Sequence, residues 1–357
     1  MSVPPRLVSF ALFVGAAAAQ APAPVLLGNR LLDGADGKEL ATLPSGTITW
    51  PQWRPDGTVH HAAGLVDPAR RRLLAADGLH LRLVAIGGDP VWQRPITDLQ
   101  LEAEVLLPQA VLGNDVAVIP DHDGHLVGVA LADGKKLWRS EADGHGELVQ
   151  DGELVAALAT HAGGRRLRAY ALGNGAPAFD ERAPKAAEFT AIGPHGIVAG
   201  GPGGAAVFAR SGPRLFAVEA PVRAAVADAS GFYLNLDTEV VAFDRAGKER
   251  WRLPADHTTF NDVRLALGPT GLLVLVRYST VSDSGAVLTA HEPERGEVAW
   301  KRTLSDLGAT HSKYWHDVAA VARDGELLVA SHAPGGQWLA ALDGKSGDVR
   351  FRIQHTK

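Results

Sequence analysis

Short apolar runs separated by turn residues follow one another along this chain, and long stretches of helical periodicity are hard to find. One stretch shows the pattern clearly. An apolar run at 116–119 leads to the turn Asp123-Gly124, then to an alternating run at 126–131, a second turn at Asp133-Gly134 and a last run at 136–139. An Asp-Gly pair between two such runs is a strong signal for a tight β-hairpin. The pattern predicts a meander of short antiparallel strands.

The same order of runs and turns recurs along the chain. Two later copies lie at 271–276, 286–292 and 298–302, and at 326–331, 338–343 and 349–353. A single meander exposes apolar faces and strand edges to water, whereas copies arranged radially cover one another's faces. The chain is therefore predicted to be all-β.

A fixed motif marks each copy: a glycine is followed four residues later by a bulky residue, with one exception in the first copy. The pairs are Gly37/Ala41, Gly88/Trp92, Gly134/Trp138, Gly175/Phe179, Gly212/Phe216, Gly247/Trp251, Gly296/Trp300 and Gly347/Phe351. Their mean spacing of about 44 residues matches one four-stranded propeller blade. We expect an eight-bladed β-propeller of four-stranded antiparallel blades.

The first copy leaves one alternative open. Ala41 replaces the aromatic residue there, and only 25–43 is left to build its strands. Seven blades with an extra N-terminal hairpin are therefore the second possibility.

The motif residues are expected to have structural roles. The glycine would supply a positive φ in the turn before the last strand of each blade. The aromatic ring would then pack sideways on the neighbouring blade and bury roughly 150–250 Å². We assign this role to Gly88, Trp92, Gly134, Trp138, Gly247, Trp251, Gly296, Trp300, Gly347 and Phe351.

Two segments resemble the repeats of PQQ-like (quinoprotein-like) β-propellers. They are 124–131 with 133–138, and 240–244 with 247–251, which follow the pattern Gly-x-Leu-x-Ala-Leu-Asp and then Thr-Gly-Lys-x-x-Trp. The resemblance implies a propeller fold. Its members include quinoprotein dehydrogenases and non-catalytic proteins such as the propeller subunit of the outer-membrane β-barrel assembly machinery.

The absence of cysteine limits what the resemblance can imply. Dehydrogenases of this kind carry PQQ beneath a vicinal disulfide, with calcium held by acidic side chains, and that disulfide cannot form here. Thiolate metal sites, a cysteine nucleophile and a lipid-bearing cysteine are excluded as well. We expect no PQQ, no other cofactor and no lipid anchor.

The N-terminus is typical of a secretory signal peptide. Arg6 precedes an apolar stretch at 7–19, and Ala19-Gln20-Ala21 matches a cleavage site. No stretch reaches the roughly 18 apolar residues of a membrane span. We expect a signal peptide at 1–21 and one propeller domain at 22–357, exported to the periplasm or outside the cell and soluble after cleavage near Ala21.

The charges predict no nucleic-acid partner, because the net charge of −5 is spread without a basic stripe. Catalytic residues are not predicted either. The nucleophile pattern Gly-x-Ser-x-Gly is absent, the glycine-rich 200–204 is typical of a hairpin, and Asp121 to His125 is typical of a hairpin turn rather than a metal loop.

Unusual side chains gather in the connectors between copies, which should end at the mouth of the central channel. Histidine and carboxylate groups there could orient a polar ligand, although their spacing matches no metal motif. The candidate binding residues are Trp53, His60, His257, Asp262, His311, Trp315, His316 and Asp317.

Two functional hypotheses follow. The first is a monomeric, non-catalytic scaffold or binding module for another envelope protein, with an exposed patch built partly from Trp50, Trp53 and Trp315. The alternative is a PQQ- or metal-dependent oxidoreductase, or a small-ligand binder, that uses the channel mouth.

Overall fold

The computed structural model describes most of the region after the predicted signal peptide. The described residues are 24–27, 29–43, 52–54, 58–61, 63–101, 105, 107–121, 123–140, 145–161, 163–255, 261–268, 270–279, 286–303, 305–307, 317–323, 326–333 and 336–356. They form β-strands and turns, with one short 3-10 helix at Leu107–Gln109.

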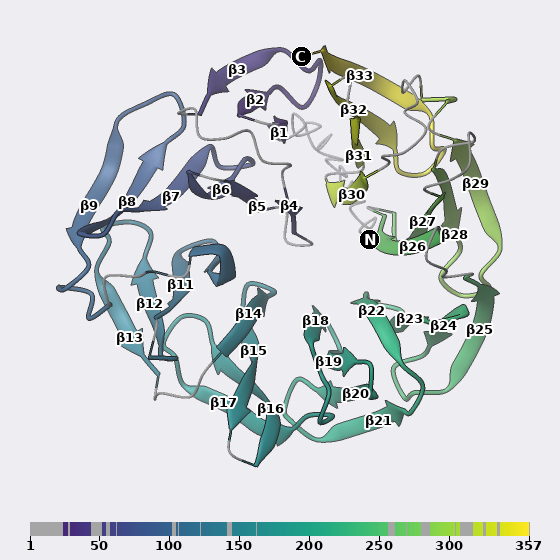
Figure 1. Cartoon of the computed structure of the whole chain (residues 1–357), viewed down its shortest axis with the longest axis horizontal. Coiled ribbons are helices and arrows are strands. Elements are labelled where there is room, and N and C mark those ends of the chain that lie inside the picture. Colours follow the sequence, from purple (N-terminus) through teal and green to yellow (C-terminus); the bar gives the residue numbers. More distant parts are fainter. Residues whose placement is uncertain are drawn as a thin grey trace, which may run out of the picture.

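Eight antiparallel sheets surround a central axis in sequence order, which confirms the predicted eight-bladed propeller (Figure 1). The six sheets of blades 3 to 8 have four strands each, ordered from the channel outward. Blades 3 to 5 contain β10 (Val111–Leu112), β11 (Val116–Pro120), β12 (Leu126–Ala130), β13 (Lys136–Arg139); β14 (His145–Gln150), β15 (Leu154–His161), β16 (Gly164–Ala171), β17 (Pro177–Arg182); and β18 (Phe189–Gly193), β19 (Gly196–Gly201), β20 (Gly204–Ala209), β21 (Arg214–Val218).

Blades 6 to 8 follow the same meander. Their strands are β22 (Val222–Ala227), β23 (Phe232–Leu236), β24 (Glu239–Phe243), β25 (Glu249–Pro254); β26 (Asn261–Leu267), β27 (Leu273–Ser279), β28 (Val287–His291), β29 (Val298–Thr303); and β30 (Asp317–Arg323), β31 (Glu326–Ala333), β32 (Gly336–Asp343), β33 (Val349–Thr356).

Blades 1 and 2 depart from the four-stranded plan. The first sheet has three described strands, β1 (Val25–Leu27), β2 (Arg30–Leu32) and β3 (Glu39–Thr42). The second has six: β4 (Gln52–Trp53), β5 (Val59–His61), β6 (Gly64–Asp67), β7 (Arg72–Ala76), β8 (His80–Ala85) and β9 (Pro90–Pro95).

The β4–β5 hairpin explains how the inner ring is completed. The innermost strand of each blade from β6 to β30 lies beside that of the next blade, and β4 lies beside β30. The short strand β4 therefore occupies the inner place that β1–β3 leave free, although its hydrogen bonds join it to the second sheet.

The hydrophobic core is divided into eight clusters among the described residues, and each cluster lies between two successive blades. In the cluster between blades 3 and 4, for example, Val118 and Trp138 meet Val155 and Leu172. Burial of apolar surface at about 25 cal/mol per Å² is the main force that holds the blades together. We call each of these blade-to-blade interfaces a seam.

At seven of the eight seams, the bulky motif residue of one blade packs on a glycine of the next blade. Gly134 shows the geometry: its φ is 71°, and a Cβ added there would lie 2.6 Å from the Trp92 ring. Only glycine allows both the backbone conformation and the close approach. The same contact joins Trp138 to Gly175, Phe179 to Gly212, Phe216 to Gly247, Trp251 to Gly296 and Trp300 to Gly347.

The motif of the second copy needs a correction. Gly88 was predicted to have the positive φ, but that conformation belongs to Gly87, whose φ is 82°. A Cβ on Gly87 would lie 3.4 Å from the Ala41 methyl group. The small residue Ala41 thus takes the place of the aromatic ring at the seam between blades 1 and 2.

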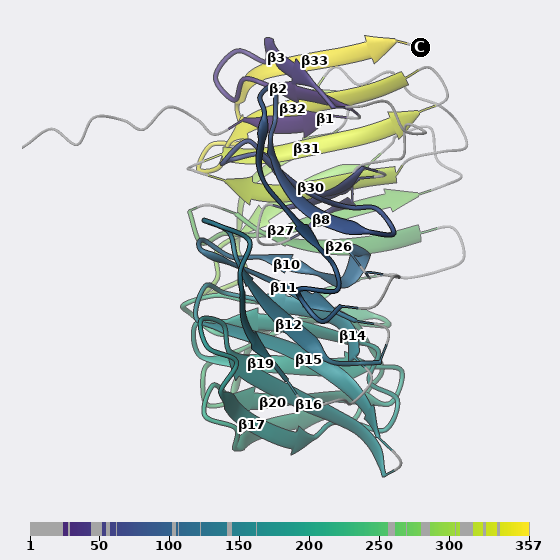
Figure 2. The same cartoon turned by 90° about the vertical axis from the view of Figure 1, so that its left-hand side faces the viewer.

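Blades 8 and 1 close the ring without an exchanged strand, because β33 and β1 belong to separate sheets among the described residues. Both views place β33 beside β3 (Figures 1 and 2). Gly37 contacts Ile353 and Phe351, and Leu27 and Leu339 belong to the apolar cluster behind them. Face-to-face packing therefore completes the propeller.

Candidate functional site

The eight predicted binding side chains lie outside the part of the molecule that the structure describes. His257, His311, Trp315 and His316 lie outside the described residues, as does Trp50. For the other four, only the backbone is described.

Those four backbones lie near the channel. Trp53 ends β4, His60 lies in β5, Asp262 lies in β26 and Asp317 begins β30. Because β4 and β26 both lie beside β30, the fold brings three of these strands to the same side of the channel.

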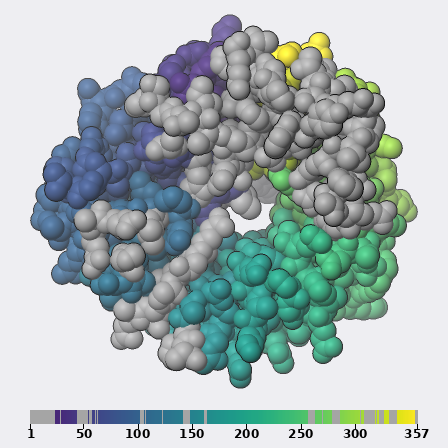
Figure 3. All heavy atoms as spheres, in the orientation of Figure 1, coloured from purple at the N-terminus to yellow at the C-terminus, as the bar shows by residue number. Residues whose placement is uncertain are grey.

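A hollow lies at the centre of the ring (Figure 3), where described residues of the inner strands line a cavity. The cavity has a volume of about 640 Å³ and runs along the inner strands β10, β14, β18 and β22, with Leu267 of β26 and the β4–β5 hairpin completing its wall. This volume lies within the range of about 300–1,000 Å³ of small-molecule sites.

The wall of the cavity is mainly apolar. Phe189, Ile192 and Val226 line it from neighbouring blades, and Val149 and Leu267 extend the apolar surface on either side. Neutral polar groups interrupt this surface, namely Thr58, Asn114, Gln150 and Thr190. Such a wall can hold a largely apolar molecule and orient it through a few hydrogen bonds.

Arg54 fixes the hairpin that narrows the channel. Its backbone N–H donates to the Thr58 carbonyl at 2.9 Å, which forms the turn between β4 and β5. Its guanidinium is buried and donates to the carbonyls of Ala110 and Leu148, which belong to blades 3 and 4. Hydrogen bonds from a charged donor contribute about 1.5–3 kcal/mol each. The hairpin is therefore tied across the channel to two other blades.

Ion pairs occupy one end of the channel, where the turns after the inner strands lie. Asp67 is buried and accepts from Arg70 at 3.1 Å and from Arg72 at 2.8 Å. Arg70 also donates to the Asn114 side chain of the next blade. Asp151, the one carboxylate among the described lining residues, is paired with Arg210. The charged groups at this end thus have partners within the protein.

At the other end, Arg223 is half exposed and donates to Asp237 at 2.8 Å. Within the described part of the chain, no three histidine, cysteine or carboxylate side chains are grouped to hold a metal ion. The described lining therefore presents hydrogen-bonding groups and a single carboxylate, Asp151, which is paired with Arg210.

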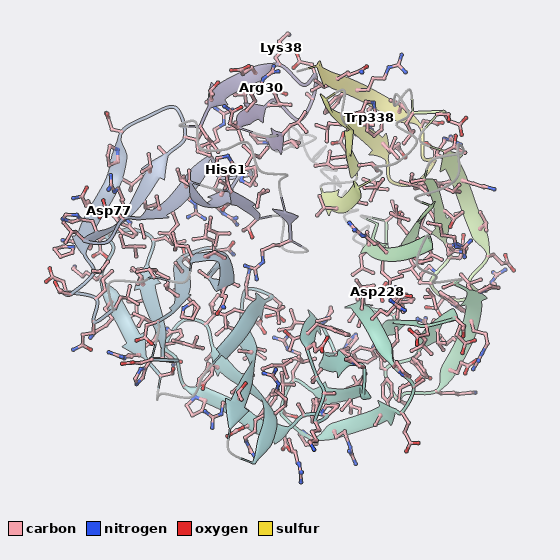
Figure 4. All side chains as sticks on the ribbon, in the orientation of Figure 1. Arg30, Lys38, His61, Asp77, Asp228 and Trp338 are labelled. Atoms are coloured by element: carbon pink, nitrogen blue, oxygen red, sulfur yellow. The ribbon has the colours of Figure 1, made fainter. Side chains whose placement is uncertain are left out.

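Two histidines with well-defined surroundings are internal to the blades. Burial lowers the pKa of His61 and that of His291. His291 Nδ1 donates to the Gly296 carbonyl at 2.9 Å, and its Nε2 accepts from Thr289 at 3.0 Å, which fits a neutral ring. His61 accepts from the Ala63 N–H at 3.0 Å within the second sheet (Figure 4). Both imidazoles therefore stabilise turns within their own blades.

A buried polar group lies at the inner turn of blade 6. Burial raises the pKa of Tyr233 to about 12, and its hydroxyl donates to Asp228 at 3.1 Å. Ser230 donates to the same carboxylate at 2.6 Å. Figure 4 shows Asp228 at the channel side of this blade. The N–H groups of Ser230 and Gly231 donate to the same carboxylate, so these contacts stabilise the turn between β22 and β23.

The segment Asp121 to His125 is a hairpin turn, as predicted. Gly124 has a φ of 83°, and β11 and β12 lie on either side. Asp121 is buried and accepts from Arg139 at 2.8 Å and from the His125 N–H at 2.8 Å. The Asp121 carboxylate therefore stabilises this turn within blade 3.

Sequence reasoning missed Arg54 and its hairpin. Among the described residues the hairpin occurs once, between the first and second copies of the motif, so the repeat gives no equivalent position for comparison. Trp50 and Trp53 were predicted to bind a partner because they are aromatic. The structure shows that the next residue, Arg54, anchors the hairpin.

Comparisons with known proteins agree with this architecture. The family model described as "Outer membrane protein assembly factor BamB" matches residues 14–217 and 196–357. No curated protein matches the sequence. Within the described residues, no helix is long and apolar enough to span a membrane.

The chain is similar to several solved structures at low sequence identity, and the two with a TM-score above 0.5 share its fold. BamB from Moraxella catarrhalis is 14% identical, with a TM-score of 0.51 over 86% of this chain and 88% of that one. A KlHsv2 variant with loop 6CD replaced by a Gly-Ser linker is 11% identical, with a TM-score of 0.51 over 86% and 96%. A europium-containing methanol dehydrogenase is 11% identical, with a TM-score of 0.48 over 84% and 77%. From the family match and the repeats that build its eight blades, the chain belongs to the BamB-type family of PQQ-like β-propellers.

Proposed function

We propose that this chain is an exported, non-catalytic propeller that acts as a protein-interaction scaffold in the cell envelope. The observation that carries the proposal is the family match, which spans almost the whole propeller and is described by a role in outer-membrane protein assembly. The predicted signal peptide at 1–21 supports export.

The framework suits a scaffold. Eight seams hold the blades in a closed ring. Loops held by such a framework lose little conformational entropy when a partner binds. The partner would be an envelope protein or an unfolded polypeptide, bound by a monomer without a lipid anchor.

The expected contact surface includes Trp50, Trp53 and Trp315 near the channel mouth. Tryptophan often dominates binding energy because it buries a large rigid surface. The variant with all three residues changed to alanine should therefore capture its partner at least about tenfold less well, since each such contact contributes about 1 kcal/mol or more.

A matched variant controls for general surface effects. Leu137→Ala combined with Val298→Ala removes exposed apolar side chains from outer strands of the same propeller. Both variants should keep the wild-type unfolding midpoint, and only the tryptophan variant should lose cross-linking to the partner. Equal capture by both would contradict the proposed contact surface.

The cavity favours a second candidate function, the binding of a small, largely apolar molecule. Ala225 lines the channel, so Ala225→Trp should block binding there while the protein partner is still captured. Mass spectrometry of small molecules extracted from wild-type and variant protein separates the two functions. A molecule that co-purifies with wild-type protein alone would support the channel as a binding site.

A further inference from the structure

Asn174 and Gly175 form the only Asn-Gly pair in the sequence. They lie in the turn between β16 and β17, on which Trp138 of the preceding blade packs. Asn174 is exposed, and Gly175 has no Cβ that would shield its backbone nitrogen from the Asn174 side chain once the turn opens. We propose that Asn174 is a site of spontaneous deamidation and that the packing of Trp138 on Gly175 restrains the reaction.

The chemistry needs only this dipeptide and water. The backbone nitrogen of Gly175 attacks Cγ of Asn174, and the new N–Cγ bond closes a succinimide ring. The Cγ–Nδ2 bond breaks, and the side-chain nitrogen leaves as ammonia with the proton from the Gly175 N–H. Water that adds at Cγ breaks the N–Cγ bond and gives an ordinary aspartate in place of the asparagine. Water that adds at the backbone carbonyl carbon of residue 174 breaks its bond to the Gly175 nitrogen and gives isoaspartate, in which the main chain passes through Cγ.

The folded turn holds the reacting nitrogen away from this path. The Gly175 N–H donates to the Ala171 carbonyl at 2.8 Å. A Cβ on Gly175 would lie 2.5 Å from the Trp138 ring, and the indole Nε1 donates to the Leu172 carbonyl at 3.0 Å. The turn is thus held at three of its residues. Attack on Cγ requires release of the nitrogen, so the seam must open locally first.

The repeat itself shows how the two products would differ. Asp36 and Asp133 occupy the equivalent place in copies one and three, and each accepts from the N–H two residues later, at 3.0 and 3.1 Å. Asn174 makes the same contact with Ala176 at 3.0 Å. The aspartate product would therefore preserve the turn. Isoaspartate lengthens the main chain beside Gly175 and would displace it from Trp138.

Full-length protein incubated at mildly alkaline pH, with and without urea, tests the proposal. Tryptic peptide 169–182 is analysed by mass spectrometry, and isoaspartate is measured by enzymatic methyl transfer. In urea, Asn174 should react faster than Asn29 and Asn114, which precede arginine and aspartate. Without urea, the reaction at Asn174 should be slower by about tenfold or more, because it requires local opening.

Substitution of Trp138 tests whether its packing slows deamidation, because the sequence around Asn174 stays the same. Trp138→Ala should raise the rate without urea toward the rate in urea. Trp138→Phe keeps a ring on Gly175 but lacks the indole donor, so it should give an intermediate rate even if the alanine variant folds poorly. Equal rates with and without urea, or an unchanged rate in Trp138→Phe and Trp138→Ala, would overturn the proposal.

Asn174→Asp provides the matched control for the products. This variant should unfold at the wild-type urea concentration, whereas a sample enriched in isoaspartate should unfold at a lower one. A loss of stability in Asn174→Asp equal to that of the isoaspartate sample would contradict the proposed equivalence with Asp36 and Asp133.

Discussion

Four of the eight seams contain a tryptophan that also forms a hydrogen bond to the next blade, and four do not. Trp92, Trp138, Trp251 and Trp300 donate to backbone carbonyls across their seams at 2.8–3.1 Å. Ala41, Phe179, Phe216 and Phe351 have no side-chain donor. Because glycine is present on the receiving side of all eight seams, close approach is the constant requirement, and the residue that fills the space can vary.

The seams without tryptophan are not equivalent to one another. Between blades 5 and 6, Phe216 lies 5.2 Å from the Phe243 ring and 5.8 Å from that of Phe232. Aromatic pairs of this kind contribute about 0.5–1.5 kcal/mol beyond their buried area. Blade 1, in contrast, is bordered by Ala41 on one side and Phe351 on the other, and it has only three described strands. We therefore expect blade 1 to be the least stable part of the ring.

Removing a tryptophan should have the largest effect. Trp138 is 8% exposed, so Trp138→Ala leaves a cavity and should lower the free energy of unfolding by about 3–5 kcal/mol. Phe179 at the next seam is only partly buried, and Phe179→Ala should cost less, about 1.5–3 kcal/mol. Urea denaturation measures both. Equal losses in the free energy of unfolding would contradict the expected difference between seams with and without tryptophan.

Hydrogen exchange should locate the weakest blade. Amide hydrogens of β1–β3 should exchange faster than those of β11 and β12, because fewer contacts must break to expose them. Mass spectrometry of peptic peptides can compare the two regions in a single experiment. Equal protection of blades 1 and 3 would show that packing against blade 8 compensates for the small residue Ala41 at the seam with blade 2.

Replacing an indole by a phenyl ring isolates the hydrogen bond. Trp300→Phe keeps the ring against Gly347 and removes the donor to the Gly344 carbonyl. We expect a loss of about 1–2 kcal/mol, since one buried carbonyl loses its partner. A loss as large as that of Trp300→Ala would mean that packing of the larger ring, and not the hydrogen bond, distinguishes these seams.

Lowering the pH should have the smallest effect on stability. Arg350 lowers the pKa of Asp343 to about 2, and Asp343 also accepts from the N–H groups of Lys345 and Ser346 in the turn that carries Gly347. Because the folded pKa lies below the unfolded value of about 3.9, this carboxylate stabilises the fold above that value. Its contribution is lost as the pH falls from about 4 to about 2.

Unfolding midpoints of wild type and Asp343→Asn between about pH 5 and about pH 2 measure this effect. The difference between the two proteins should shrink as the solution becomes more acidic. A constant difference over the whole range would show that the charge of Asp343 does not contribute.

The sequence allowed the fold to be predicted because the same turn and packing contact occur eight times. The exceptions were local. The positive φ moved from Gly88 to Gly87, since both residues of that turn are glycine and the spacing cannot choose between them. The place of β4 beside β30 depends on a contact between distant parts of the chain, which no local pattern encodes.

The candidate site was less predictable. The channel location followed from the repeat, but Arg54 lies in a hairpin that has no second copy. The mainly apolar cavity wall arises because neighbouring inner strands present partly exposed residues such as Val149, Ile192 and Val226 to the same space. The predicted histidines at 257, 311 and 316 stay predictions.

Native purification tests the proposed function most directly. Protein isolated from its own source under mild conditions is analysed by native mass spectrometry, absorbance spectroscopy and metal determination. A non-catalytic scaffold should be obtained with an envelope protein bound, and its own mass should equal that of the polypeptide after signal cleavage. A stoichiometric quinone or metal ion on this chain would contradict the account.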